Sequence, residues 1–293
     1  MSTPGTFDLA DFLPDLVKLA DRQIERVPPG WTLTAARLEG FLREPPAWAV
    51  HYPESPGLVK LDIGVEADGR LLAACQYGVV ERSCILCWVA ADPGEPGALE
   101  DLLGALEDAA RGAGCGEILQ TRNELGIGWF GIPLVWDHVI RGLREAGWEV
   151  GDRWAIMTAG TASAPPVPAK PPFSTLRLDR SGNPAAREWW AHVRIGDVPA
   201  ADCSIWGPPE LFRDCPGYGA WTTMESIDVE EPFQRHGIAR WLIGEQMRWL
   251  AGRGISQVLL FTETGNLPAR RCFEQAGFAL GPECWAMRRS LFP

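Results

Sequence analysis

The N-terminal part of the chain distributes its apolar residues with a helical period. Leu9, Phe12, Leu13, Leu16 and Ala20 recur every three or four positions, which predicts an amphipathic helix. The pattern that follows predicts a helix at 34–43, strands at 58–65, 71–80 and 84–91, a helix at 98–111, a strand at 117–121 and a helix at 134–145.

The C-terminal part shows a second series of elements. The same criteria predict strands at 189–195, 200–206 and 221–229, a helix at 237–251, a strand at 257–262, a helix at 268–275 and a last strand at 284–288. Asp68-Gly69, between the first two strands of the chain, is typical of a tight β-hairpin. Together the elements predict an α/β (α+β) fold with mixed sheets flanked by helices.

The two series are related by an internal repeat. The segment 145–157 resembles 275–287 in a shared frame of Ala-Gly-aromatic, a later Gly and a final Met, and 112–121 resembles 252–262. Both pairs occur in the same order, about 130–140 residues apart. The chain is therefore predicted to contain two copies of one structural unit, although too few residues precede Trp189 to repeat the first two helices.

A stretch rich in Pro, Ala and Ser separates the copies. Residues 159–172 contain five prolines, a composition that sustains neither a helix nor a central strand and is typical of an extended linker. The sequence thus predicts a first domain at 1–158, a linker at 159–172 and a second domain at 173–293.

Charge and composition narrow the classes of function. A formal net charge of −11 disfavours binding to nucleic acid or to an anionic membrane and favours a cationic partner such as an amine. No secretory leader or membrane-spanning stretch is evident, and the cysteines lie mostly in apolar runs, so a cytoplasmic protein is expected. Cys84 and Cys87 fall within a strand-like run with no second ligand pair nearby. We interpret them as core thiols and predict no metal site.

The segment from Ile227 to Leu242 carries the clearest chemistry. A strand is predicted to end at Val229 and a helix to open at Gly237, and the first N–H groups of a helix can hold a phosphate. Gly237 allows close approach of the backbone to an anion, and Arg235 adds a cationic contact. The small side chain of Ala239 leaves the next helical turn accessible.

These residues carry a resemblance to a known family. Gln234-x-x-Gly237-x-Ala239 resembles the Q/R-x-x-G-x-G/A pyrophosphate loop of the GCN5-related N-acetyltransferase (GNAT) superfamily. Val229 matches the strand that pairs with pantetheine in that family. The resemblance implies a cofactor site for acetyl-CoA that includes, besides these four residues, Ile227, Arg235, His236 and Ile238. His236 is expected to contribute only its backbone.

A second motif lies downstream. Asn266, Ala269, Phe273 and the pair Gly277-Phe278 match the family pattern N-x-x-A-x-x-x-[YF]-x-x-x-G-[FW]. The resemblance implies that Asn266 contacts the pantetheine arm and that Phe273 borders the cofactor. Members of the family often place Tyr, a proton donor, where this chain has Phe273, which has no proton to give.

The first copy departs from the phosphate-loop pattern. Gly97 stands at the position of Gly237, but Glu95 replaces Arg235, Pro96 removes an N–H and Leu99 replaces the small Ala239. This copy is predicted to bind coenzyme A poorly, so that the chain resembles tandem GNAT proteins with one working half.

Acyl transfer to an amine needs a base that removes a proton and a donor that polarises the carbonyl. The resemblance places a backbone N–H near Val229 for the carbonyl. Glu225 is the first candidate for the base, because regular alternation puts it on the same strand face as Val229, and Asp228 is the second. The long connection 207–219 could cover an acceptor pocket, with Glu210, Asp214 and Tyr218 as possible contacts.

The sequence accordingly predicts an N-acyltransferase that moves an acetyl group from acetyl-CoA to a small-molecule amine. No nucleic acid or membrane is expected as a partner, and the protein is expected to be a monomer or a homodimer. Two alternatives stay open: a non-catalytic acyl-CoA-binding module, and an N-acetyltransferase acting on proteins or peptides.

Overall fold

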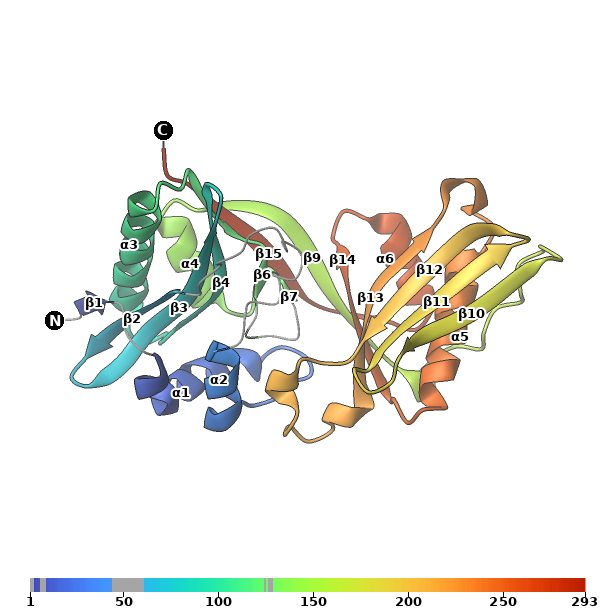
Figure 1. Ribbon diagram of the computed structural model, residues 1–293, viewed down its shortest axis with the longest axis horizontal. Coiled ribbons are helices and arrows are strands. Elements are labelled where there is room, and N and C mark those ends of the chain that lie inside the picture. Colours follow the sequence, from blue (N-terminus) through green and yellow to red (C-terminus); the bar gives the residue numbers. More distant parts are fainter. Residues whose placement is uncertain (1–2, 6–8, 44–60, 124, 126–128, 293) are drawn as a thin grey trace. The chain divides into compact units, whose positions relative to one another are not determined.

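The structure is a computed structural model that describes residues 3–5, 9–43, 61–123, 125 and 129–292. The chain divides into two compact units (Figure 1). The first comprises Met1–Trp154, Pro209–Cys215 and Pro282–Pro293, and the second comprises Ala155–Pro208 and Pro216–Gly281. These units are not the two sequence segments on either side of 159–172, because two long strands each contribute to both units.

The first unit is a sheet between helices. Its strands follow the order β1-β2-β3-β4-β5-β15, with a short β8 also pairing with β15. Helices α1 and α3 contact its strands, α2 packs against α1, and α4 packs against α3. The strands are β1 (Thr3–Gly5), β2 (Leu61–Ala67), β3 (Arg70–Val80), β4 (Ser83–Ala91), β5 (Glu117–Gln120), β6 (Arg122–Asn123), β7 (Trp129–Phe130) and β8 (Ile132–Pro133). The helices are η1 (Leu9–Phe12), α1 (Leu13–Ile24), α2 (Ala35–Arg43), α3 (Pro96–Gly112) and α4 (Asp137–Glu145).

The predicted elements of this unit are confirmed. The apolar period at the N-terminus forms η1 and α1, and Leu16 and Ala20 are fully buried. Asp68 and Gly69 both have positive φ, 54° and 74°, as a two-residue hairpin turn requires. Cys84 and Cys87 are buried in β4. The strand predicted at 58–65 begins at Leu61 within the described residues, and 58–60 lie outside them.

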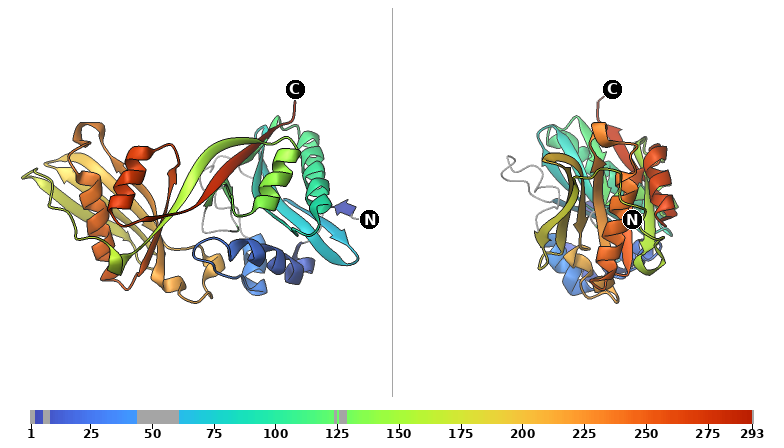
Figure 2. Two further views of the ribbon diagram at one scale, coloured as in Figure 1. Left: turned by 180° about the vertical axis from the view of Figure 1, so that it is seen from behind. Right: turned by 90° about the vertical axis from the view of Figure 1, so that its right-hand side faces the viewer.

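The second unit has its helices on one face of the sheet. Its strands follow the order β9-β14-β13-β12-β11-β10, and only β13 and β14 are parallel among the neighbouring pairs from β10 to β14. Figure 1 shows β10 to β12 in front of α5, and the view from behind in Figure 2 shows α5 and α6 in front of the strands. The elements are β9 (Glu149–Gly160), η3 (Thr161–Ser163), β10 (Leu176–Asn183), β11 (Glu188–Ile195), β12 (Val198–Trp206), η5 (Tyr218–Ala220), β13 (Trp221–Val229), η6 (Glu231–Phe233), α5 (Ile238–Ala251), β14 (Gln257–Glu263), α6 (Leu267–Gln275) and β15 (Ala279–Ser290).

Burial explains this one-sided arrangement. Alternate strand residues such as Ala191, Val193, Cys203 and Ile205 pack against the apolar face of α5 in one core. Helices corresponding to α1 and α2 are missing between β10 and β11, which an antiparallel hairpin joins directly. The sequence predicted this absence from the small number of residues before Trp189.

Two strands were not predicted at their full extent. β10 was not predicted from the sequence, because Leu176 is its only buried residue and its alternation of apolar and polar residues is therefore weak. β9 continues to Gly160, into the segment predicted to be a linker, and β15 begins at Ala279, before the predicted 284–288. The rest of the linker lies against the second unit, where Ala164 and Val167 pack on its core.

β9 and β15 also explain why each unit is discontinuous in sequence. The unit boundaries fall within them, at Trp154 and at Gly281. In the first unit, residues Met287–Ser290 of β15 pair antiparallel with β5. The last strand of the chain therefore completes the sheet of the first unit.

The connection between β12 and β13 also belongs to the first unit. Residues 209–215 contain the short helix η4 (Glu210–Phe212), which contacts α2. Phe212 is 1% exposed and lies against the Trp31 ring, and Asp214 accepts two hydrogen bonds from Arg37 at 2.7 and 2.9 Å. Within the described residues, no helix of the chain is long and apolar enough to cross a bilayer.

Candidate functional site

The loop between β13 and α5 has the backbone geometry of an anion-binding turn. After η6, the backbone enters the left-handed region at Arg235 (φ 65°) and at Gly237 (φ 79°), which is the N-cap of α5. Gly237 meets this requirement without strain. A hydrogen bond of 3.0 Å from Gln234 Nε2 to the Val229 carbonyl closes the loop across its base.

The loop leaves consecutive N–H groups available. Within the described residues, the backbone N–H groups from Arg235 to Arg240 donate no hydrogen bond, and the first helical bond is from Trp241 to the Gly237 carbonyl. Unsatisfied N–H groups at a helix start, together with the helix dipole, form a site for phosphate. This part of the sequence prediction therefore has the geometry that it requires.

A groove of about 660 Å³ extends from this loop between β13 and α6. Eight of the ten residues predicted for the cofactor line it: Ile227, Val229, Gln234, Arg235, Gly237, Ile238, Ala239 and Asn266. The two others point elsewhere. The His236 ring lies against the Phe173 ring, with 5.3 Å between the ring centroids. Phe273 is buried beside Phe278, and 5.9 Å separates their ring centroids. The ring of Phe273 thus belongs to the core, and its neighbour Cys272 lines the groove.

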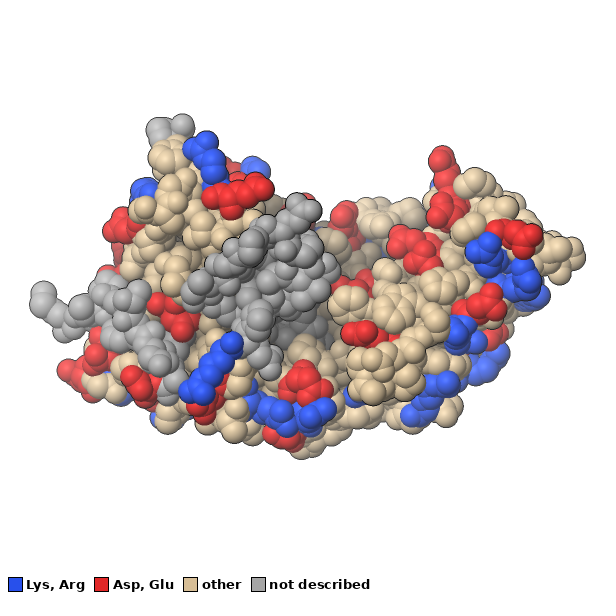
Figure 3. Space-filling model, in the orientation of Figure 1, with Lys and Arg blue, Asp and Glu red and all other residues tan. Residues whose placement is uncertain are grey.

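The charged side chains of the groove are mainly cationic. Arg235, Arg240 and Arg271 line it, with Asp228 as the acidic member. This grouping stands out on a chain of net charge −11, and on the face shown in Figure 3 basic and acidic side chains of the described residues are interspersed. Sequence reasoning missed Arg240 and Arg271. Their positions could have indicated them, because Arg240 directly follows the first motif and Arg271 lies within the second.

The strand beside the groove separates from its parallel neighbour. Within the described residues, β13 pairs with β14 from Trp221 to Met224, and the ladder does not extend to Ile227–Val229 on that side. The Glu230 N–H donates to Ala200, on the side of β12, at 3.0 Å. Because successive strand N–H groups alternate in direction, those of Ile227 and Val229 point into the gap. A donor near Val229 is thus present, as predicted.

The two candidate bases differ in position. Asp228 is exposed, lines the groove and lies opposite Asp202 in the β12–β13 ladder. Burial, and then the charge of Asp228, raises the pKa of Asp202. Glu225 stands at a register shift, because Ser226 pairs with Ser204 and Met224 with Ile205. The regular alternation used to place Glu225 with Val229 does not extend across this bulge.

Asn266 has a structural role at the start of α6. Its side-chain oxygen accepts the Ala269 N–H at 3.2 Å and so caps the helix. Its amide group remains at the edge of the groove. On the same helix, burial raises the pKa of Cys272, while the charge of Arg240 acts in the opposite direction.

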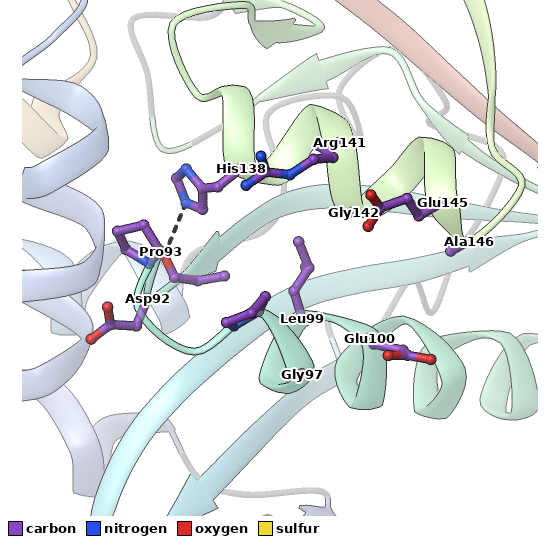
Figure 4. A pocket seen from close by; sticks show the side chains of 12 residues that line it. Asp92, Pro93, Gly97, Leu99, Glu100, His138, Arg141, Gly142, Glu145 and Ala146 are labelled. Atoms are coloured by element: carbon purple, nitrogen blue, oxygen red, sulfur yellow. Dashed lines mark hydrogen bonds between the residues drawn. The ribbon is translucent and has the colours of Figure 1, made fainter.

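The corresponding place in the first unit holds a smaller pocket of about 290 Å³, between α3 and α4 (Figure 4). Here α3 begins at Pro96, and Gly97 is its second residue instead of a left-handed cap. The turn uses its own N–H groups, because Gly94 donates to the Asp92 carboxylate at 3.0 Å and Glu95 to the Asp92 carbonyl at 3.1 Å. A phosphate would find few donors here.

Side-chain size closes this pocket further. Leu99 lies directly against Gly142 of α4, so that a β-carbon at Gly142 would come within 2.5 Å of it (Figure 4). The Nε2–H of His138 donates to the Ala91 carbonyl at 3.1 Å, and burial lowers the pKa of His138. The first unit thus keeps the fold of the site without its anion-binding loop.

The comparisons with known proteins agree with this geometry. The family model described as "Acetyltransferase (GNAT) family" matches residues 154–278, which include the loop, the groove and both motifs. Residues 154–278 are a GNAT domain. The chain that carries this domain in its second unit is an acyltransferase. A search of curated proteins gives no match.

Solved structures extend the likeness to the whole chain. A tandem GNAT protein from the clavulanic acid biosynthesis pathway aligns over 100% of this chain and 99% of its own, with a TM-score of 0.72 and 12% identity. A GCN5-related N-acetyltransferase from Sphaerobacter thermophilus covers 100% and 96%, with a TM-score of 0.69 and 14% identity. At these identities the likeness establishes the tandem GNAT fold.

A third likeness is to a glucosamine N-acetyltransferase region of a fungal multi-domain β-N-acetylglucosaminidase. It covers 99% of this chain and 38% of that protein, with a TM-score of 0.70 and 13% identity. The two-copy arrangement therefore also occurs inside a larger protein.

Proposed function

We propose that the second unit binds acetyl-CoA and transfers its acetyl group to the amine of a small-molecule acceptor. The observation that carries the proposal is the row of backbone N–H groups from Arg235 to Arg240, which donate no hydrogen bond. They lie at one end of a groove that three arginines line. A diphosphate fits such a row by charge and by hydrogen-bonding capacity. The family's usual thioester substrate supplies that group at one end and an acyl group at the other.

The rest of the groove fits the pantetheine arm. The N–H groups of Ile227 and Val229 point into the gap beside β13, where an extended amide chain can add to the strand. The Asn266 amide and the apolar side chains of Ile238 and Ala269 form the opposite wall. The cofactor would supply an activated acetyl carbonyl at the inner end of this arm.

Besides binding the cofactor, the protein has to supply a hydrogen-bond donor for the carbonyl oxygen and a base for the amine. The nitrogen of the acceptor forms a bond with the acetyl carbon as the carbon–sulfur bond breaks, and the amine gives up a proton. An N–H of the open β13 edge would stabilise charge on the carbonyl oxygen. Asp228, which borders the groove, or Glu225 at the bulge would take the proton from the amine, directly or through water.

An acidic acceptor region favours an amine. Asp202 and Asp228 are cross-strand neighbours next to the groove, and the net charge of −11 attracts cations over longer range. Burial, and then the repulsion between the two carboxylates, raises the pKa of Asp202. A bound ammonium group would relieve that repulsion.

The first test is calorimetric binding of acetyl-CoA and CoA to the wild type, Gly237→Asp and Gly97→Asp. We expect the wild type to bind and Gly237→Asp to lose binding, because a carboxylate would occupy the anion site and the backbone there is left-handed. Gly97→Asp, the matched control in the first unit, should bind like the wild type. A wild type that binds neither ligand would contradict the proposal.

The second test is release of the CoA thiol with a panel of small primary amines. Transfer to at least one amine, reduced in Asp228→Asn or Glu225→Gln, is the expected result. Tight binding of acetyl-CoA without transfer to any amine or peptide would instead favour a non-catalytic binding module. This second candidate function is supported by Phe273, which is buried and stands where many family members carry Tyr.

A further inference from the structure

The sheet of the second unit ends in an unpaired strand, β10 (Figure 1). Within the described residues, β11 is the one strand that pairs with it. From Arg177 to Asn183 its residues are exposed, apart from the half-buried Leu178. The strand at the corresponding end of the first unit, β1, has three residues, whereas β10 has eight. A long exposed strand edge is a template for pairing with another strand.

A hydrogen bond at the start of β10 shows which backbone groups face outward. The Thr175 carbonyl accepts the Gly196 N–H across the β10–β11 pair. Because the direction of the backbone groups alternates along an antiparallel strand, the odd-numbered residues of β10 point toward β11, and Leu178 and Arg180 point away from it. The outward N–H and carbonyl groups are therefore available to a second strand.

The charged side chains of β10 suit a second copy of the same strand. Leu176 and Leu178 pack in or against the core on the α5 side. Arg177 and Asp179 alternate with them and so lie on the other face of the sheet. Two copies related by a two-fold axis bring these strands together antiparallel, and residues directly opposite each other share a face. With the axis at Leu178, Arg177 of each copy faces Asp179 of the other.

Charge selects this register over its neighbours. An axis at Arg177, Asp179 or Arg180 would instead set two like charges directly opposite each other, which destabilises a strand pair. The axis at Leu178 also aligns the free backbone groups. The Leu178 N–H faces the Leu178 carbonyl of the second copy, and the Arg180 N–H faces the Leu176 carbonyl.

We propose that the protein forms a homodimer in which the β10 strands of two copies pair antiparallel about Leu178. The surface lies outside the cofactor groove, and the inference does not depend on the proposed function. Arg177 has one acidic partner within its own copy, Asp197, whose side chain is fully exposed, so this ion pair competes weakly. A single strand pair is a small interface, and we expect a Kd on the order of 10 μM.

Sedimentation velocity of the full chain, over concentrations on both sides of that Kd, tests the proposal. Arg177→Asp and Asp179→Arg should each raise the Kd by at least about tenfold, because each sets like charges opposite at two symmetry-related places. The first variant makes the net charge more negative and the second makes it less negative. An effect of overall charge would therefore not weaken both dimers.

An equal mixture of the two variants provides the sharpest comparison. In a heterodimer of Arg177→Asp with Asp179→Arg, every changed side chain again faces an opposite charge, so the mixture should associate like the wild type. The control Asp197→Asn removes the ion pair of Arg177 within one copy and should leave the Kd unchanged. Thermal unfolding of each variant checks that the fold is retained.

Three outcomes would overturn the inference. The first is a wild type that stays monomeric at all of these concentrations. The second is a dimer that both charge reversals leave intact, which would locate the contact on another surface. The third is a mixture of folded variants that fails to associate. The proposed function stands in each case, because β10 does not line the groove.

Discussion

At the scale of single residues, corresponding glycines of the two copies have different backbone roles. Gly237 caps α5 with a φ of 79°, whereas Gly97 is the second residue of α3 and has no left-handed backbone. A β-carbon would meet no atom within 4 Å at either position. The two glycines therefore differ in backbone conformation and not in the space around them.

Alanine at these glycines should act in opposite directions. Gly237→Ala is expected to lower the free energy of unfolding by about 1 kcal/mol, because a left-handed backbone strains an L-residue. Gly97→Ala should raise it by about 0.5 kcal/mol, since alanine favours a helix and restricts the unfolded chain. Urea unfolding of both variants measures the difference. Equal effects of the same sign would show that the two loops have similar backbones.

At the scale of elements, the two helix pairs are packed differently. In the first unit Leu99 of α3 fills the space beside Gly142 of α4. In the second unit Ala239 of α5 and Cys272 of α6 both line the groove, which stays open. The same strand-helix-strand-helix order thus gives a closed pocket in one copy and a groove in the other. Leu99 contributes to this difference, because its side chain is larger than that of Ala239 and lies against Gly142.

Exchanging these side chains tests the interpretation. Ala239→Leu should weaken acetyl-CoA binding by at least about tenfold, because the leucine would occupy the groove. Leu99→Ala should leave binding unchanged but lower the free energy of unfolding by about 2–5 kcal/mol, since Leu99 is only 3% exposed. Calorimetry and thermal unfolding provide the two readouts. Unaltered binding in Ala239→Leu would mean that the cofactor does not pass this helix turn.

At the scale of the whole molecule, neither sequence copy contains all of its own unit. The first unit takes residues 282–293 from the end of the chain and residues 209–215 from the middle of the second copy. The β5 edge is covered by β15, and Phe212 is buried beside Trp31. Removal of these segments would expose a strand edge and an apolar surface.

The fragment 1–158 should therefore not fold by itself. We expect it to aggregate or to lack a cooperative thermal transition, whereas co-expression with 159–293 should recover soluble protein that contains both fragments. Size-exclusion chromatography and circular dichroism follow the outcome. A fragment that unfolds cooperatively and stays monomeric would show that β15 and 209–215 are not needed by the first unit.

The amino-acid sequence by itself determined the local features of this protein. The period of apolar residues predicted the helices and most strands, and the spacing of Gln234, Gly237 and Ala239 predicted an anion-binding loop, because backbone conformation depends on near neighbours. The repeat also predicted the relation between the two copies. Weakly patterned strands such as β10 were beyond this reasoning, because exposed edge positions impose little apolar alternation.

Only the tertiary structure decided the arrangements that depend on residues far apart in the chain. It placed Cys272 instead of Phe273 at the groove, brought Arg240 and Arg271 to one site and assigned β15 to the first unit. The direction of a helix face, the bulge at Glu225 and the partner of an edge strand are set by packing across the fold. No pattern local to those residues contains that information.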